Sequence, residues 1–193
     1  MSLSGPEFIP APAPAVRTGD RSAAMAAAVE RLPVRLVLDR LRSAHNVGNI
    51  FRLADAVGAE GVITCGYTAA PPHPKLAKTA RGCDQLVPWE GSPDARTAVQ
   101  ALRERGYAVY AVETVESARP VWEQPLRFPA AFVFGNEALG VTPESLPFCD
   151  GVVCLPCRGV KNSVNVGNCA AVVLYEALRQ WLAARAGEGD GHG

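Results

Sequence analysis

Short apolar runs alternate along most of this chain with stretches whose apolar residues recur every three or four positions. The short runs predict strands, and the longer spacing predicts helices with one buried face. Strands that alternate with helices of about 10 to 20 residues are typical of an α/β fold with a doubly wound, mostly parallel sheet. The expected strands are 34–38, 61–65, 86–89, 107–112, 131–134 and 151–155, and the expected helices are 47–57, 75–80, 93–105 and one that begins at 166.

The segment 155–178 joins a polar loop to a strongly apolar helix. Asn165 is a candidate N-cap, and a helix that is buried from its first turn holds the preceding loop rigid. That loop is therefore expected to present Gly159, Ser163 and Asn165 to a ligand. The predicted buried face consists of Val166, Cys169, Ala170, Val173, Leu174 and Ala177.

Other helix boundaries carry recognisable signals. Ser92 and Pro93 predict an N-cap and first helical residue, and Gly106 predicts the end of the same helix. Asn46 is a candidate N-cap for the helix 47–57. The tetrapeptide Asn-Val-Gly-Asn occurs twice, at 46–49 and 165–168, each time at the start of a helix. Since the flanking sequences do not repeat, we interpret this as parallel capping rather than a duplicated domain.

The hydrophobic pattern covers only part of the chain. Residues 1–32 are rich in Pro and Ala and predict an extended arm, with a possible short helix over 22–32. Residues 186–193 predict a disordered tail. The working domain is therefore expected at 33–185.

Composition narrows the function classes. With 193 residues, 48% of them hydrophobic, the chain has enough apolar material for one compact domain. A net charge of zero and a pI near 6.8 argue against bulk electrostatic wrapping of nucleic acid, so any RNA contact is expected to be local. The sequence has no secretory-signal pattern and no long apolar span, so we expect no membrane association and a cytoplasmic location.

Six cysteines raise the possibility of metal or redox chemistry, and Cys154 and Cys157 have C-x-x-C spacing. No second pair completes a zinc tetrad. Cys65, Cys154 and Cys169 lie in apolar patterns, where cysteine acts as a small hydrophobic residue. Buried thiols are therefore the favoured interpretation, and a thiol oxidoreductase stays an alternative.

Ligands of parallel sheets bind at loops that follow the carboxyl ends of strands. Three such loops carry polar groups. The first carries Asn46 and Arg52, the second has Gly-Asn-Glu137 after an apolar run, and the third carries Ser163 and Asn165 with Arg158 and Lys161 as candidate phosphate contacts. Taken singly, the loops favour a simpler interpretation as helix caps, an ordinary turn and solvated charges.

In this order, the three loops resemble the signature motifs of the SPOUT methyltransferases, specifically the TrmH branch of RNA ribose 2′-O-methyltransferases. The resemblance covers about residues 34–180. It is carried by N-x-G-x-x-x-R at Asn46, Gly48 and Arg52, by F-G-N-E-x-x-G at 134–140, and by L-P with G-x-x-x-S-x-N at Gly159, Ser163 and Asn165.

The resemblance implies an α/β fold with a C-terminal trefoil knot, which general rules of chain topology would not predict. It also implies a homodimer with each active site near the subunit interface. The implied cofactor is S-adenosylmethionine, held around Thr114, Gly135, Leu155 and Ser163. The implied substrate is RNA, and no metal is required.

Within that resemblance, Arg52 corresponds to the residue thought to activate the ribose hydroxyl. Because a neutral guanidinium is energetically expensive, we expect Arg52 to orient the hydroxyl and hold a phosphate. Asn46, Glu137 and Asn165 are expected to hold Arg52 and the nucleotide, and Ser163 to contact a phosphate or the cofactor.

The substrate is less closely specified than the reaction. The family's rRNA-directed members carry an extra N-terminal RNA-binding domain that this sequence lacks, so tRNA is favoured. Gly167 and Asn168 depart from the usual third motif, which weakens inference about the substrate. The alternatives are an rRNA 2′-O-methyltransferase, a base methyltransferase and a catalytically silent RNA-binding module.

Overall fold

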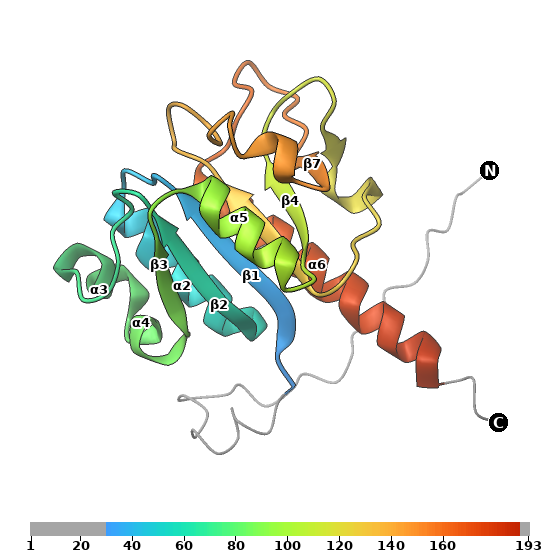
Figure 1. Ribbon diagram of the computed structural model, residues 1–193, viewed down its shortest axis with the longest axis horizontal. Coiled ribbons are helices and arrows are strands. Elements are labelled where there is room, and N and C mark those ends of the chain that lie inside the picture. The colour runs from blue at the N-terminus through green and yellow to red at the C-terminus, as the bar shows by residue number, and fades with distance from the viewer. Residues whose placement is uncertain (1–29, 190–193) are drawn as a thin grey trace, which may run out of the picture. The chain divides into compact units, whose positions relative to one another are not determined.

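The computed structural model in Figure 1 describes residues 30–189. The predicted arm up to residue 29 and the last four residues lie outside the described part. The described chain forms a seven-stranded sheet in which every pairing is parallel, with the order β3-β2-β1-β6-β4-β7-β5. This confirms the expected parallel α/β sheet. The strands are β1 (Leu32–Asp39), β2 (Ala59–Cys65), β3 (Trp89–Ser92), β4 (Ala108–Val112), β5 (Arg119–Pro120), β6 (Ala130–Phe134) and β7 (Gly151–Cys154).

Helices cover both faces of the sheet. The helices are α2 (Ala44–Val57), α3 (Pro74–Ala80), α4 (Cys83–Leu86), α5 (Ala95–Glu104) and α6 (Val166–Gly189), with 3₁₀ turns at Val121–Glu123 and Leu146–Phe148. In Figure 1, α5 crosses the near face of the sheet, and α2 lies behind it. Alternation along β1 separates the two cores: Leu36 and Leu38 pack with α2 and α6, whereas Val37 packs with α5.

The helix α2 begins three residues earlier than the sequence predicted. Its N-cap is Ser43, whose Oγ accepts a hydrogen bond from the backbone N–H of Asn46 at 3.3 Å. The prediction that Asn46 caps this helix is therefore wrong. Because Ser43 does the capping, the side chain of Asn46 is available for other partners.

Two further boundaries differ from the prediction. The apolar run 86–89 suggested a strand, but Leu86 ends α4 and the edge strand β3 starts only at Trp89. The N-cap of α5 is Asp94, which accepts from the N–H of Thr97 at 2.7 Å, so Ser92 and Pro93 precede the helix. A carboxylate acceptor in register with the first turn outweighs the Ser-Pro signal.

Both ends of the last helix are also defined. Asn165 caps α6 as predicted, because its Oδ1 accepts from the N–H groups of Gly167 at 2.9 Å and Asn168 at 3.3 Å. At its other end α6 continues to Gly189, past the predicted boundary at residue 185.

The two-residue strand β5 was missed, since so short a segment has no hydrophobic pattern. Within residues 30–189, no helix is long and apolar enough to cross a membrane.

The strand order brings the predicted loops together. Leu38 and Val112 both pair with Phe134, and Val112 also pairs with Val153, so β1, β6, β4 and β7 end at the same edge. The loops that follow these strands must therefore converge there. Figure 1 shows them gathered beyond the carboxyl end of the sheet.

Candidate active site

A cavity of about 560 Å³ lies among the loops that follow β4, β6 and β7. Its size falls in the usual range for small-molecule sites, about 300 to 1,000 Å³. The lining residues come from 112–114, 134–140, 154–155, 162–166 and Cys169. The cavity therefore draws on the second and third predicted loops, and on a further loop after β4.

Glu137 is the polar centre of the cavity's rim. Its carboxylate accepts hydrogen bonds from the backbone N–H of Arg42 at 2.8 Å, the N–H of Ser43 at 3.2 Å and the Nδ2 of Asn46 at 2.9 Å. These donors belong to the loop after β1 and the first turn of α2. One side chain from the second loop thus holds the first loop against the cavity.

This environment keeps Glu137 ionised. Partial burial alone would raise the pKa of its carboxyl group, but hydrogen bonds from Arg42, Asn46 and Ser43 outweigh that effect and leave the pKa below its ordinary value. The carboxylate acts as an acceptor in all three contacts, so at neutral pH it anchors the loop rather than supplying a proton.

Asn165 connects the third loop to the same cluster. Its Nδ2 donates to the Oδ1 of Asn46 at 3.2 Å while its Oδ1 caps α6. Gly167 allows this approach, because a Cβ there would lie only 2.6 Å from the side-chain nitrogen of Asn49. The two Asn-Val-Gly-Asn tetrapeptides therefore lie against each other, one from α2 and one from the start of α6.

A second polar corner, which the sequence did not reveal, is built by Glu113. Its carboxylate accepts from the N–H of Val141 at 2.8 Å and from the N–H of Thr114 at 2.8 Å. Gly140 has φ of +72°, and a Cβ there would lie 2.2 Å from the same carboxylate. Glu113 directly follows the buried strand β4, and the rule that sites lie at strand ends would have pointed to it.

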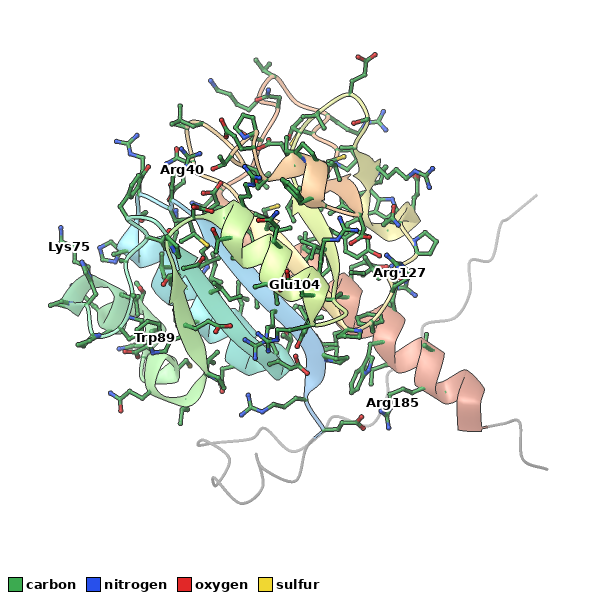
Figure 2. The ribbon with its side chains drawn as sticks, viewed as in Figure 1. Arg40, Lys75, Trp89, Glu104, Arg127 and Arg185 are labelled. Atoms are coloured by element: carbon green, nitrogen blue, oxygen red, sulfur yellow. The ribbon has the colours of Figure 1, made fainter. Side chains whose placement is uncertain are left out.

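Two buried polar residues fix the base of the loop after β6. Asp39, fully buried at the end of β1, accepts a hydrogen bond from the backbone N–H of Thr142 at 2.6 Å. Asn136 is 4% exposed, and its Oδ1 accepts from the N–H groups of Ala138 and Leu139. Its Nδ2 donates to the backbone oxygen of Arg40 at 2.7 Å. Figure 2 labels Arg40 at this edge of the sheet.

The predicted cofactor residues all line the cavity. Gly135 is required there, since a Cβ at this position would lie 2.1 Å from the backbone nitrogen of Val141. The Thr114 Oγ1 donates to the carbonyl of Asn162 at 3.4 Å and so links the loop after β4 to the loop before α6. The residues predicted for the cofactor and found in the lining are Thr114, Gly135, Leu155 and Ser163.

Not every predicted residue joins this cluster. Arg52 lies on the exposed side of α2 and does not line the cavity. Gly159 is also outside the lining, and a Cβ there would meet no atom within 4 Å, so no close approach requires that glycine. Arg158 and Lys161 are exposed in the same loop. Of the first loop, only Asn46 is joined to the rim by a hydrogen bond from its own side chain.

The cysteines are free thiols. Burial raises the pKa of Cys65 to about 12 and the pKa of Cys169 to about 11. Burial likewise raises the pKa of Cys154, the first residue of the C-x-x-C pair. A raised pKa disfavours the nucleophilic thiolate that redox chemistry needs. Among residues 30–189, no group of three or more His, Cys, Asp or Glu side chains is arranged to hold a metal.

Comparison with known proteins extends this picture. Residues 33–175 match the model of the SpoU rRNA Methylase family. The chain is 36% identical over 149 residues to a tRNA (guanosine(18)-2′-O)-methyltransferase of Thermus thermophilus, covering 77% of this chain and 76% of the relative. It is 32% identical to a 23S rRNA (guanosine-2′-O-)-methyltransferase of Vibrio parahaemolyticus, covering 79% of this chain but 62% of the relative.

A solved structure has the same fold. The SpoU methyltransferase AviRb from Streptomyces viridochromogenes, in complex with AdoMet, superposes with a TM-score of 0.73 at 27% identity. The match covers 81% of this chain and 63% of that chain. This chain thus spans less than two thirds of the rRNA-directed relative and of this solved structure. Because the family model covers the sheet, the cavity loops and the start of α6, the chain belongs to the SpoU rRNA Methylase family.

Proposed function

We propose that this RNA ribose 2′-O-methyltransferase acts on tRNA, with a site organised by Glu137, Asn46 and Asn165. The class of reaction follows from family membership, and the cofactor of this class is S-adenosylmethionine. The observation that carries the site is the hydrogen-bonded chain from Glu137 to Asn46 to Asn165, at 2.9 and 3.2 Å, on the rim of the cavity.

The cavity fits the cofactor. Most of its lining residues lie in loops, and Gly135 lets the backbone nitrogen of Val141 come within 2.1 Å of where a Cβ would lie, so the two ends of the loop after β6 pack closely together. Thr114, Leu155 and Ser163 complete the proposed cofactor contacts. When bound, the cofactor supplies a methyl group already activated by a sulfonium.

The chain's own residues have to position the ribose. The 2′-hydroxyl must lie about 3 Å from the methyl carbon and in line with the bond that breaks. Glu137, held ionised, fixes the loop after β1, and Asn46 and Asn165 fix the starts of α2 and α6 beside it. We assign these three residues to holding the nucleotide and Ser163 to a phosphate or cofactor contact.

Arg52 is proposed to orient the hydroxyl and clamp the adjacent phosphate from a second subunit. Two observations support this. Arg52 is exposed on α2 and absent from the cavity of its own chain. The outward face of α6 carries apolar side chains that a single chain leaves in water: Val172, Tyr175 and Leu182, each 46–53% exposed, beside Trp122 at 50%. An apolar patch of this kind marks an interface, and we assign it to a homodimer.

Mixed dimers test the role of Arg52 across the interface. Arg52→Ala and Glu137→Gln are each expected to abolish methylation while the protein still binds S-adenosylmethionine. If Arg52 acts on the partner's site, a mixed dimer of the two variants keeps one intact site. An equal mixture that is allowed to exchange subunits then recovers about a quarter of wild-type activity. No recovery would place Arg52 in the same site as its own Glu137.

We further infer that α6 and the loop before it form the trefoil knot typical of SPOUT proteins. The path of the chain supports this inference. In the sheet, β6 and β4 separate β7 from β1, yet after β7 the chain crosses back so that α6 packs against α2 and β1. A crystallographic trace tests the knot. When the two ends of the traced backbone are drawn apart, the chain should remain knotted. A backbone that straightens without a knot would overturn the inference.

The choice of tRNA rests on the 36% identity to the tRNA-directed relative, against 32% to the rRNA-directed one. Incubation with labelled S-adenosylmethionine and either unmodified total tRNA or rRNA distinguishes the two. We expect label in tRNA that stays with the sugar after glycosidic cleavage. Label in rRNA alone would correct the substrate, and label that leaves with the base would correct the reaction. RNA binding without any label would indicate a silent binding module.

A further inference from the structure

The loop after β2 carries an exposed aromatic residue beside the site. Tyr67 is 61% exposed, yet its hydroxyl accepts a hydrogen bond from the Nδ2 of Asn136 at 2.8 Å. Asn136 is buried next to Glu137 and lines the cavity. The ring of Tyr67 thus lies in solvent while its hydroxyl is tied to the site.

The backbone on both sides of Tyr67 is fixed as well. The N–H of Gly66 donates to the carbonyl of Ser92 at 3.1 Å. Thr68, 6% exposed, donates from its Oγ1 to the carbonyl of Leu38 and accepts from the N–H of Leu41, both at 2.9 Å. An aromatic side chain held at three points loses little conformational entropy when a ligand covers it.

The loop after β1, which is bonded to the loop of Tyr67 through Thr68, carries two arginines. Arg40 packs its Cγ close to Gly66, and Arg42 is exposed two residues further along the same loop. Asp39 pairs with Arg40 at 3.1 Å, whereas no partner within residues 30–189 forms an ion pair or hydrogen bond with the side chain of Arg42. An exposed ring beside free positive charge is the combination that binds single-stranded nucleic acid, with bases stacking on the ring and phosphates meeting the cation.

We infer that Tyr67 stacks on a nucleobase of the bound RNA next to the cavity, with Arg42 contacting a phosphate of the same segment. The inference rests on the proposed function, since it concerns how the RNA substrate reaches the site. The ligand is an unpaired nucleotide of any base, because every base offers a π-face to the ring. Asn136 connects this platform directly to the rim where the ribose is held.

A purely structural role for Tyr67 makes a different prediction. If the residue served only to bind Asn136, loss of its hydroxyl would do as much harm as loss of the whole side chain. If the ring stacks on a base, Tyr67→Phe should keep most of the RNA affinity and Tyr67→Ala should lose it. The two variants therefore separate the ring from the hydroxyl.

The experiment measures binding of unmodified tRNA to the full chain in the presence of S-adenosylhomocysteine. We expect Tyr67→Ala to weaken binding about tenfold, within the range seen when one stacked base is lost, and Tyr67→Phe by less than about threefold. Affinity for S-adenosylhomocysteine should stay unchanged in both. Trp89→Ala is the control, because Trp89 is also exposed but lies in the edge strand away from these loops, as Figure 2 shows.

A second readout reports stacking itself. A tRNA with 2-aminopurine next to the methylated position should lose fluorescence on binding to the wild type and to Tyr67→Phe, but not to Tyr67→Ala. Equal tRNA affinity of Tyr67→Ala and wild type, or equal losses in the Phe and Ala variants, would overturn the inference. Tyr67-dependent binding without methylation would keep the inference and remove the proposed function.

Discussion

The two Asn-Val-Gly-Asn tetrapeptides are identical in sequence, lie against each other, and perform different tasks. In the copy at 165–168 the first asparagine caps α6 with its Oδ1. In the copy at 46–49 the same residue lies inside α2, because Ser43 is the cap, and its side chain donates to Glu137. Three residues of upstream sequence, not the tetrapeptide, decide whether the asparagine supports a helix or joins the site.

The glycines of the two copies should show the largest difference. A Cβ at Gly48 would lie 2.4 Å from the backbone oxygen of Leu76 in α3, whereas a Cβ at Gly167 would meet the movable side chain of Asn49. Gly48→Ala should lower the free energy of unfolding by about 2 kcal/mol, since overpacking exceeds the helix-propensity gain of about 1 kcal/mol. Gly167→Ala should stay within about 1 kcal/mol.

Chemical denaturation of the two alanine variants checks this ranking. Equal losses, or a larger loss for Gly167→Ala, would mean that α3 yields more easily than its backbone contact with α2 indicates.

The asparagines should differ by a smaller amount. Asn46→Asp places a second carboxylate where the Asn46 amide donated to Glu137 at 2.9 Å, and it should cost about 1 kcal/mol of unfolding free energy. Asn165→Asp loses the exposed hydrogen bond to the Asn46 Oδ1 but keeps the capping acceptor and adds a favourable charge at the N-terminus of α6, so it should change stability by less than about 0.5 kcal/mol. Thermal unfolding measures both. A larger loss of stability for Asn165→Asp than for Asn46→Asp would contradict the assignment of Asn165, and not Asn46, as a helix cap.

Acid should remove the stabilisation that the Glu137 carboxylate provides through its hydrogen bond with Asn46 of the tetrapeptide at 46–49. The pKa of Glu137 is lowered in the folded protein, so its contribution is fully present above the ordinary value of 4.5 and is lost as the pH falls through the folded pKa. The stability difference between wild type and Glu137→Gln should therefore be constant near neutral pH and shrink below about pH 4.5. Denaturation at a series of pH values tests this, and a difference that grows on acidification would be contrary to it.

The smallest effect concerns the residue that follows each copy, Ile50 in α2 and Cys169 in α6. Burial raises the pKa of Cys169 to about 11, so at pH 8 only about a thousandth of this thiol is ionised. Alkylation by iodoacetamide should be correspondingly slow at Cys169. Rapid modification, located by peptide mass spectrometry, would show that the start of α6 opens readily and exposes Cys169.

The sequence predicted the parallel sheet, its buried strands and the capping of α6, since each rests on periodicity or a local cap. It could not predict that Ser43 caps α2 in place of Asn46, because both residue types are good caps and the contact of the Asn46 side chain with Glu137 is formed only in the folded protein. Glu113 and Asn136 were missed for a related reason. Their partners lie 28 and 96 residues away in the sequence, so no local pattern reveals these contacts, although the position of Glu113 at a strand end marks it as a candidate.

The resemblance to a known family identified candidate cofactor and catalytic residues that hydrophobic periodicity and helix capping could not identify. The residues predicted for the cofactor, Thr114, Gly135, Leu155 and Ser163, were named from the family resemblance, and they line one cavity because β4, β6 and β7 are neighbours. Arg52 was named in the same way but lies outside that cavity in a single chain. A motif names candidate functional residues but not their positions. Whether Arg52 reaches an active site depends on the proposed homodimer.

The most direct test of the account is methyl transfer from labelled S-adenosylmethionine to unmodified tRNA by Glu137→Gln, with cofactor binding measured by calorimetry on the same sample. Loss of the anchor for the loop after β1 should lower the rate at least about 100-fold, the cost of a misplaced reacting group, while cofactor affinity changes by less than about threefold. Methylation at the wild-type rate would contradict the central role of Glu137.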